Sequence, residues 1–149
     1  MNMQSCVSGQ KYGGLTMEAA NADDLVVTKI ENFLAKDEMQ YLIEKADGIL
    51  EQSMVMDPAT GQNVPSSART STTAFLEDGS SDPVLACIEK KCAAVAGQPL
   101  STMESMQVTR YQDGQKYDHH YDYFDTPVVA NDRAKTVFAY LQGLENLEG

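Results

Sequence analysis

The stretch QVTRYQDGQKYDHHYDYF, from Gln107 to Phe124, decides the fold expected for this chain. Apolar and polar residues alternate at its start, which is typical of a half-buried strand. Asp113 and Gly114 then provide a turn of the kind that joins two antiparallel strands. We therefore predict a β-hairpin whose second strand covers residues 117–124.

The second strand of this hairpin is expected to place an imidazole and a carboxylate on one face. His120 and Asp122 are two residues apart, about 6 to 7 Å between Cα atoms, and alternate side chains point the same way. A neutral histidine and a carboxylate belong to the two-His, one-carboxylate set that holds non-heme Fe(II). Alternation places His119 on the opposite face, where we expect no role for it. An H-x-D triplet alone is more often a polar pair on the wet face of a strand.

The surrounding residues closely resemble the metal-binding stretch of the prolyl 4-hydroxylases, a family of Fe(II)/2-oxoglutarate dioxygenases. The family pattern runs Q-V-x-x-Y, G-Q-x-Y and H-x-D-x-F. Its matches here are Gln107, Val108, Tyr111, Gly114, Gln115, Tyr117, His120, Asp122 and Phe124. The family's R-T-S matches residues 69–71, and its R-x-x-T-V-x-x-Y-L matches residues 133–141. The resemblance covers the chain from about Leu25 to its end.

The resemblance implies an α+β fold, in which an incomplete double-stranded β-helix (a jelly roll) has N-terminal helices packed on one outer face. It implies that His120 and Asp122 bind Fe(II) and that the Tyr111 phenol hydrogen-bonds the cosubstrate 2-oxoglutarate. The need for L-ascorbate stays open. The substrate implied is a proline-containing polypeptide. Residues expected along its groove or in the supporting shell are Arg69, Ser71, Glu104, Tyr117 and Arg133.

The family pattern is incomplete in this sequence. The chain has two histidines, which are adjacent, so no later histidine supplies the third ligand. The basic residue that grips the far carboxylate of 2-oxoglutarate and the closing strands of the jelly roll would also lie beyond Gly149. We expect a fragment rather than a natural short homologue, with poor Fe(II) binding and little turnover alone. The alternative function is a non-catalytic module that binds proline-rich peptides. Hydroxylation of lysyl residues or small molecules also stays open.

Composition limits the partners of the chain. Its 149 residues suit one domain, and 22 acidic against 11 basic residues give a net charge of −11. Such a charge argues against nucleic acid and against an anionic membrane surface. No apolar run approaches the length of a membrane span, and no signal peptide is visible. Many relatives work in the endoplasmic reticulum, but the sequence leaves the compartment open.

We expect no structural role for the cysteines or for the N-terminal residues. Cys6, Cys87 and Cys92 have neither a disulfide-framework nor a zinc spacing, and a bridge between Cys87 and Cys92 on one helix is disfavoured. We expect buried or idle thiols. Residues 1–22 are polar and glycine-containing, which favours a flexible leader before a domain over residues 23–149.

Two helices and several strands are expected outside the hairpin. Asp37, with Gln40 as its capping-box partner, begins the first predicted helix. Asp82 as N-cap, Pro83 in the first turn and Gly97 at the end delimit the second. The predicted strands cover residues 25–30, 54–56, 69–76, 104–111 and 135–141.

Overall fold

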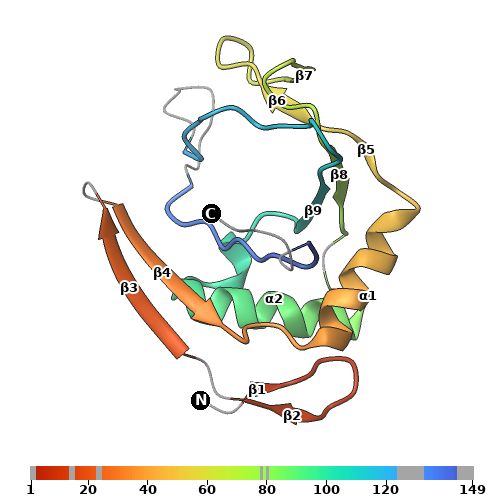
Figure 1. The fold of residues 1–149 in the computed structure, drawn as a ribbon, viewed down its shortest axis with the longest axis vertical. Coiled ribbons are helices and arrows are strands. Elements are labelled where there is room, and N and C mark those ends of the chain that lie inside the picture. Colours follow the sequence, from red (N-terminus) through yellow and green to blue (C-terminus); the bar gives the residue numbers. More distant parts are fainter. Residues whose placement is uncertain are drawn as a thin grey trace.

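The computed structural model describes residues 3–13, 16–22, 25–77, 79, 81–123 and 133–143. It is an α+β chain with two helices and short antiparallel sheets among these residues (Figure 1). The elements in chain order are β1 (Met3–Gln4), β2 (Lys11–Tyr12), β3 (Thr16–Ala22), β4 (Leu25–Glu31), α1 (Lys36–Asp47), β5 (Glu51–Gln52), β6 (Met54–Met56), β7 (Asn63–Pro65), β8 (Thr72–Phe75), α2 (Pro83–Ala96), the short 3-10 helix η1 (Leu100–Thr102) and β9 (Gln107–Arg110).

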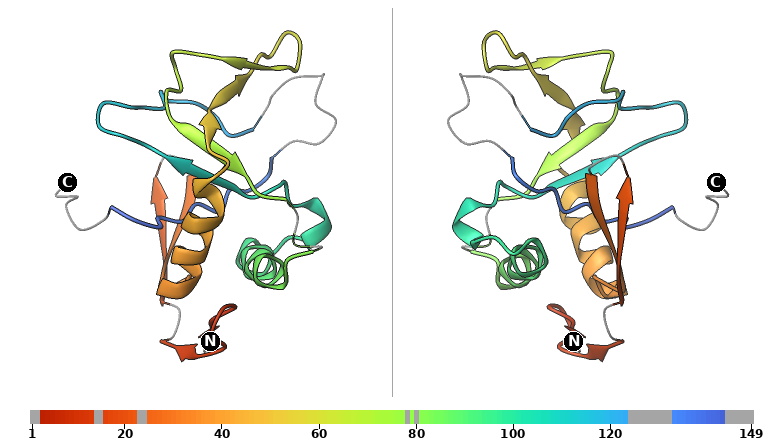
Figure 2. Two further views of the ribbon diagram at one scale, coloured as in Figure 1. Left: turned by 90° about the vertical axis from the view of Figure 1, so that its right-hand side faces the viewer. Right: turned by 90° about the vertical axis from the view of Figure 1, so that its left-hand side faces the viewer.

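The strands form three hairpins and one three-stranded sheet. The hairpins pair β1 with β2, β3 with β4 and β6 with β7, and the sheet has the order β5-β8-β9. In this sheet β8 is central, with Thr73 opposite Glu51 on one side and opposite Thr109 on the other. Figures 1 and 2 show both helices at the same end of the molecule, below β6 and β7.

The core lies between the two helices and the end of β8. Its buried residues are Phe33, Leu42, Leu76, Leu85, Ile88 and Cys92. Leu42 from α1 and Leu85 and Ile88 from α2 are each 3% exposed or less, which fits the helical spacing of apolar residues in both segments. Among the described residues, every helix is too short or too polar to cross a membrane.

The helix limits confirm part of the sequence prediction. In α2 the Asp82 carboxylate accepts hydrogen bonds from the backbone N–H groups of Val84 and Leu85, and Gly97 closes the helix in the left-handed conformation. In α1 the predicted cap at Asp37 is wrong, because the helix begins at Lys36 after Ala35. The Glu38 carboxylate, at the third helical position, accepts a bond from the Ala35 N–H at 2.8 Å.

The predicted hairpin at Gln107–Phe124 is wrong after its turn, although Phe124 itself lies outside the described residues. The turn exists, since the Gln115 N–H donates to the Gln112 carbonyl at 2.9 Å and Gly114 has a φ of 79°. After the turn, however, the chain does not fold back on β9. It pairs instead with residues 68–70, which lead into β8, the strand that β9 pairs with: the Thr70 N–H donates to the Lys116 carbonyl. A local turn signal does not tell whether the chain reverses to form a hairpin or whether a loop interrupts a single strand that keeps its direction. The strand predicted at residues 135–141 is also absent there.

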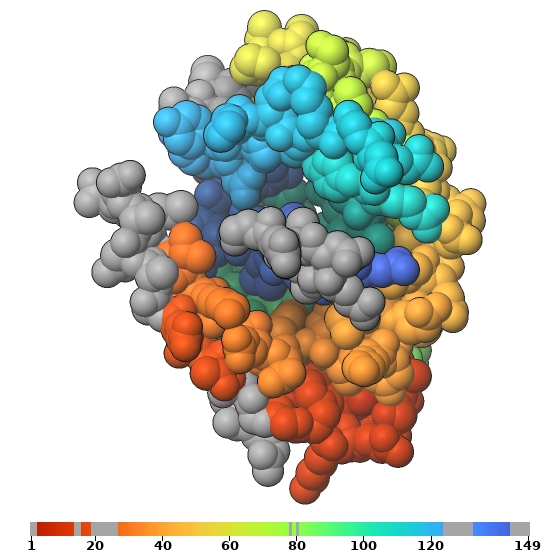
Figure 3. Space-filling view, viewed as in Figure 1, coloured from red at the N-terminus to blue at the C-terminus, as the bar shows by residue number. Residues whose placement is uncertain are grey.

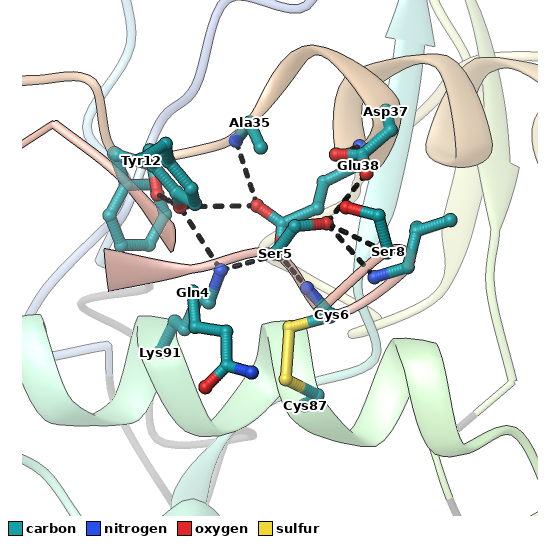
Figure 4. A network of polar contacts seen from close by, with 12 residues as sticks. Gln4, Ser5, Cys6, Ser8, Tyr12, Ala35, Asp37, Glu38, Cys87 and Lys91 are labelled. Atoms are coloured by element: carbon teal, nitrogen blue, oxygen red, sulfur yellow. Dashed lines mark hydrogen bonds and ion pairs between the residues drawn. A yellow bond between two sulfur atoms is a disulfide. The ribbon is translucent and has the colours of Figure 1, made fainter. Parts of the chain in front are cut away.

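The N-terminal residues are folded onto the helices (Figure 4). Cys6 forms a disulfide with Cys87 of α2, so the expectation of free thiols is wrong for these two residues. Cys92 is free and buried, as expected. The Cys6 N–H donates to the Glu38 carboxylate at 2.7 Å, and the Tyr12 hydroxyl donates to the Phe33 carbonyl at 2.9 Å. Residues 3–13 thus have hydrogen-bonded and covalent partners on the helices, and the division into a leader over residues 1–22 and a domain over residues 23–149 stays a prediction.

Candidate metal centre

The candidate metal ligands lie next to each other just beyond the segment that pairs with residues 68–70. The Nε2 atom of His120 is 3.2 Å from Oδ1 of Asp122, and both side chains are partly exposed, 38% and 48%. The Nδ1 atom of His120 lies 2.8 Å from the backbone carbonyl of Asp118. A carbonyl can only accept, so Nδ1 donates to it, and Nε2 is the ring nitrogen that faces the carboxylate.

Asp122 also accepts hydrogen bonds from two residues further along the chain, Arg133 and Thr136. Its second oxygen, Oδ2, accepts a hydrogen bond of 2.6 Å from the Thr136 hydroxyl. Its backbone carbonyl accepts a bond of 3.2 Å from the Arg133 guanidinium. Two contacts therefore fix one residue, although 11 and 14 positions of sequence separate the partners.

Arg133 connects Asp122 to Glu104, another of the predicted residues. The guanidinium donates from Nε to one Glu104 oxygen at 2.6 Å and from Nη2 to the other at 2.7 Å. This two-pronged geometry is the strong form of an arginine–carboxylate pair. The hydrogen bond to Glu104 raises the pKa of Arg133.

Tyr117 contacts both Arg69 and His120 through its ring. Its ring is stacked on the His120 imidazole with centroids 3.6 Å apart and an interplanar angle of 16°. The Arg69 guanidinium carbon is 4.8 Å from the centroid of the same ring. The distances place Arg69 within cation–π range. Three residues expected from the sequence are thus in one contiguous cluster.

A buried hydroxyl network supports Arg69 from the three-stranded sheet. The Nη2 atom of Arg69 donates to the Thr73 hydroxyl at 3.1 Å and to the Thr109 hydroxyl at 3.4 Å. Thr73 bonds Ser53, which bonds Ser71 at 2.8 Å, and Ser71 is fully buried. Ser71 therefore lies where it can support Arg69 through the network. Sequence reasoning missed Ser53, Thr73 and Thr109. Of these, only Thr73 lies in the threonine-rich segment 69–76, and the other two had no sequence signal.

The other predicted positions lie at the surface. Tyr111 directly follows β9 and is 47% exposed, and His119 is exposed as well. Figure 3 shows residues around 110–123, coloured cyan to light blue, on the outside of this face of the molecule. In the part of the chain that the structure describes, no three His, Cys, Asp or Glu side chains gather as a metal-binding group. His120 and Asp122 thus form a pair of candidate ligands rather than a complete set.

The curated relatives of this chain share one description, although family models do not match it. No family model matches the chain. It is 39% identical to Probable prolyl 4-hydroxylase 7 of Arabidopsis thaliana over 118 residues, which are 77% of this chain and 37% of that protein. It is 42% identical to Probable prolyl 4-hydroxylase 10 of the same plant, over 76% of this chain and 40% of that protein. Prolyl 4-hydroxylase 5 is 39% identical over 77% of this chain.

The short matched length limits the conclusions that the comparison supports. The chain spans about two fifths of the length of these curated relatives. The identity is nevertheless spread over three quarters of this chain and recurs in several relatives with the same description. These matches support a prolyl 4-hydroxylase-like family for this chain.

Proposed function

We propose that this chain carries two iron ligands and part of the peptide-binding face of a 2-oxoglutarate-dependent dioxygenase that hydroxylates prolyl residues. The observation that carries the proposal is the 3.2 Å approach of His120 Nε2 to Asp122 Oδ1. Two donors bound at right angles to a small divalent ion about 2.1 Å away lie about 3 Å apart. The two side chains therefore already have the spacing of neighbouring ligands.

The arrangement of His120 also suits a cation. A neutral imidazole that donates from Nδ1 to the Asp118 carbonyl would present a lone pair at Nε2, opposite the Asp122 oxygen. Two facing acceptors repel each other unless a proton or a metal ion lies between them. Imidazole with carboxylate is a donor set that suits Fe(II) in non-heme oxygenases. A third protein ligand would have to come from outside the described residues.

Other residues of the chain would position the organic partners. Bound Fe(II), together with 2-oxoglutarate, would supply the oxidising chemistry that hydroxylates a prolyl C–H. Tyr111, exposed beside β9, would donate a hydrogen bond from its phenol to 2-oxoglutarate, since ligand pockets orient their ligand with a few polar groups. The exposed edge of the Arg69–Tyr117 stack and the Glu104–Arg133 pair would flank a proline-containing peptide. L-ascorbate would serve as a reductant if it is required at all.

The jelly roll belongs to the same proposal. The described strands form a three-stranded antiparallel sheet and three hairpins, with helices at one end. We propose that β5, β8 and β9 are part of one sheet of a double-stranded β-helix. The partly exposed side chains of the site would then face the inside of that β-helix.

A titration with a short proline-rich peptide separates this function from a non-catalytic binding module. The peptide is titrated into the chain with and without Mn(II) and 2-oxoglutarate, and the same series is repeated with His120→Ala. The proposal predicts that the metal and the cosubstrate together strengthen peptide binding, and that His120→Ala removes the gain. Equal peptide binding in all four conditions would instead support a peptide-binding module without a metal.

A further inference from the structure

We propose that Thr136 is a positioning residue for Asp122, and that its hydroxyl holds one carboxylate oxygen so that the other stays directed at His120. The observation is that the two carboxylate oxygens of Asp122 contact different residues. Oδ2 accepts the Thr136 hydroxyl at 2.6 Å, whereas Oδ1 faces His120 Nε2 at 3.2 Å. This inference rests on the proposed metal site at His120 and Asp122.

Asp122 needs such a partner because packing does not fix its carboxylate. The side chain is 48% exposed, and the terminal torsion of an aspartate has a broad, roughly two-fold profile. Without an external bond, both oxygens exchange places freely. A hydroxyl proton on a carboxylate oxygen makes a short charge-assisted bond, and the 2.6 Å distance has this length. Asp122 is thereby held as a ligand that offers a single oxygen.

Each proposed ligand then has one outer partner. For His120 the partner is the Asp118 carbonyl, a backbone group that no side-chain substitution removes. For Asp122 it is the Thr136 side chain, which a substitution can remove. Outer partners of this kind orient metal ligands, and their loss typically weakens metal binding about 10- to 100-fold. Arg133 holds the Asp122 backbone from the same segment, so residues 133–136 approach Asp122 at two atoms.

The test is Mn(II) affinity, read from the paramagnetic broadening of amide signals near residue 120 in the full chain. We compare wild type, Thr136→Val, Thr136→Ser and the matched control Thr102→Val. Valine keeps the shape of threonine and removes the hydroxyl, serine keeps the hydroxyl, and Thr102 donates to Pro99 away from this cluster. We expect about 10-fold weaker binding for Thr136→Val, and wild-type binding for the serine variant and the control.

Two outcomes overturn different claims. If wild type binds Mn(II) through His120 and Thr136→Val binds it equally well, the positioning role is wrong and the metal site stands. If wild type shows no broadening that depends on His120, the metal site itself fails and this inference fails with it. An unchanged amide spectrum of Thr136→Val without metal establishes that the variant is folded. If it is not, Thr136→Ser compared with Thr136→Ala gives the same test.

Discussion

Glu38 and Lys91 form an ion pair that joins the first helix to the second. The Glu38 side chain is completely buried and that of Lys91 is 11% exposed. The carboxylate also accepts the Cys6 and Ala35 N–H groups and lies 3.2 Å from the Tyr12 hydroxyl, as Figure 4 shows. Burial is the main cause that raises the pKa of Tyr12, so this phenol stays protonated as a donor. The acidic group is thus fully hydrogen-bonded, as a buried charge must be.

We expect Glu38→Gln to destabilise the fold, because it leaves a mostly buried lysine without its opposite charge. Breaking a buried pair from one side costs about 3 to 5 kcal/mol. Urea unfolding followed by circular dichroism measures the change. The control is Glu31→Gln, which removes an exposed partner of Lys29 and should cost less than about 1 kcal/mol. Equal free energies of unfolding for the two variants would contradict the assigned role of Glu38.

The Cys6–Cys87 disulfide predicts the number of titratable thiols. The denatured chain should show one reactive thiol, Cys92, without reductant and three with it. In the native chain Cys92 should react slowly, since burial raises its pKa to about 11. The bridge spans 81 residues of sequence, and the paired substitution Cys6→Ser with Cys87→Ser should cost about 2 to 5 kcal/mol of stability. Three free thiols in the denatured, non-reduced chain would refute the pairing.

Acid should weaken the start of α2 through Asp82. Its carboxylate accepts hydrogen bonds from Lys45 and Tyr41 and from the backbone of α2, and these bonds hold its pKa far below the ordinary 3.8. Because the folded-state pKa is lowered, the stabilisation is complete above pH 3.8 and is lost as the pH falls below that value. Asp82→Asn keeps a good cap without the charge, so its stability should depend less on pH between about 2 and 5. Parallel stability curves for both proteins over this window would contradict the assignment.

The second helix could be predicted because its limits are local. Asp82, Pro83 and Gly97 act on backbone groups within a few residues, so their order in the sequence determines the element. The resemblance likewise identified the candidate residues of the metal centre from contiguous motifs. Arg69, Tyr117 and His120 then proved to lie in one contiguous cluster.

Other features depend on distant partners that a single sequence does not reveal. The segment after Gly114 could form a hairpin or continue along residues 68–70, and only the competition for that partner strand decides. The same holds for the pairing of Cys6 with Cys87 and for the burial of Glu38, an acid in the polar first turn of a helix. The bond from Thr136 to Asp122 bridges 14 positions and has no periodic signature.

The central claim is that His120 and Asp122 bind one divalent ion, and a Mn(II) titration followed by amide NMR tests it most directly. The account predicts broadening centred on residues 118–122 in wild type, and its loss in His120→Ala and in Asp122→Ala. His119→Ala is the matched control and should bind as wild type does. Broadening that is spread over other acidic residues and unchanged by His120→Ala would contradict the claim.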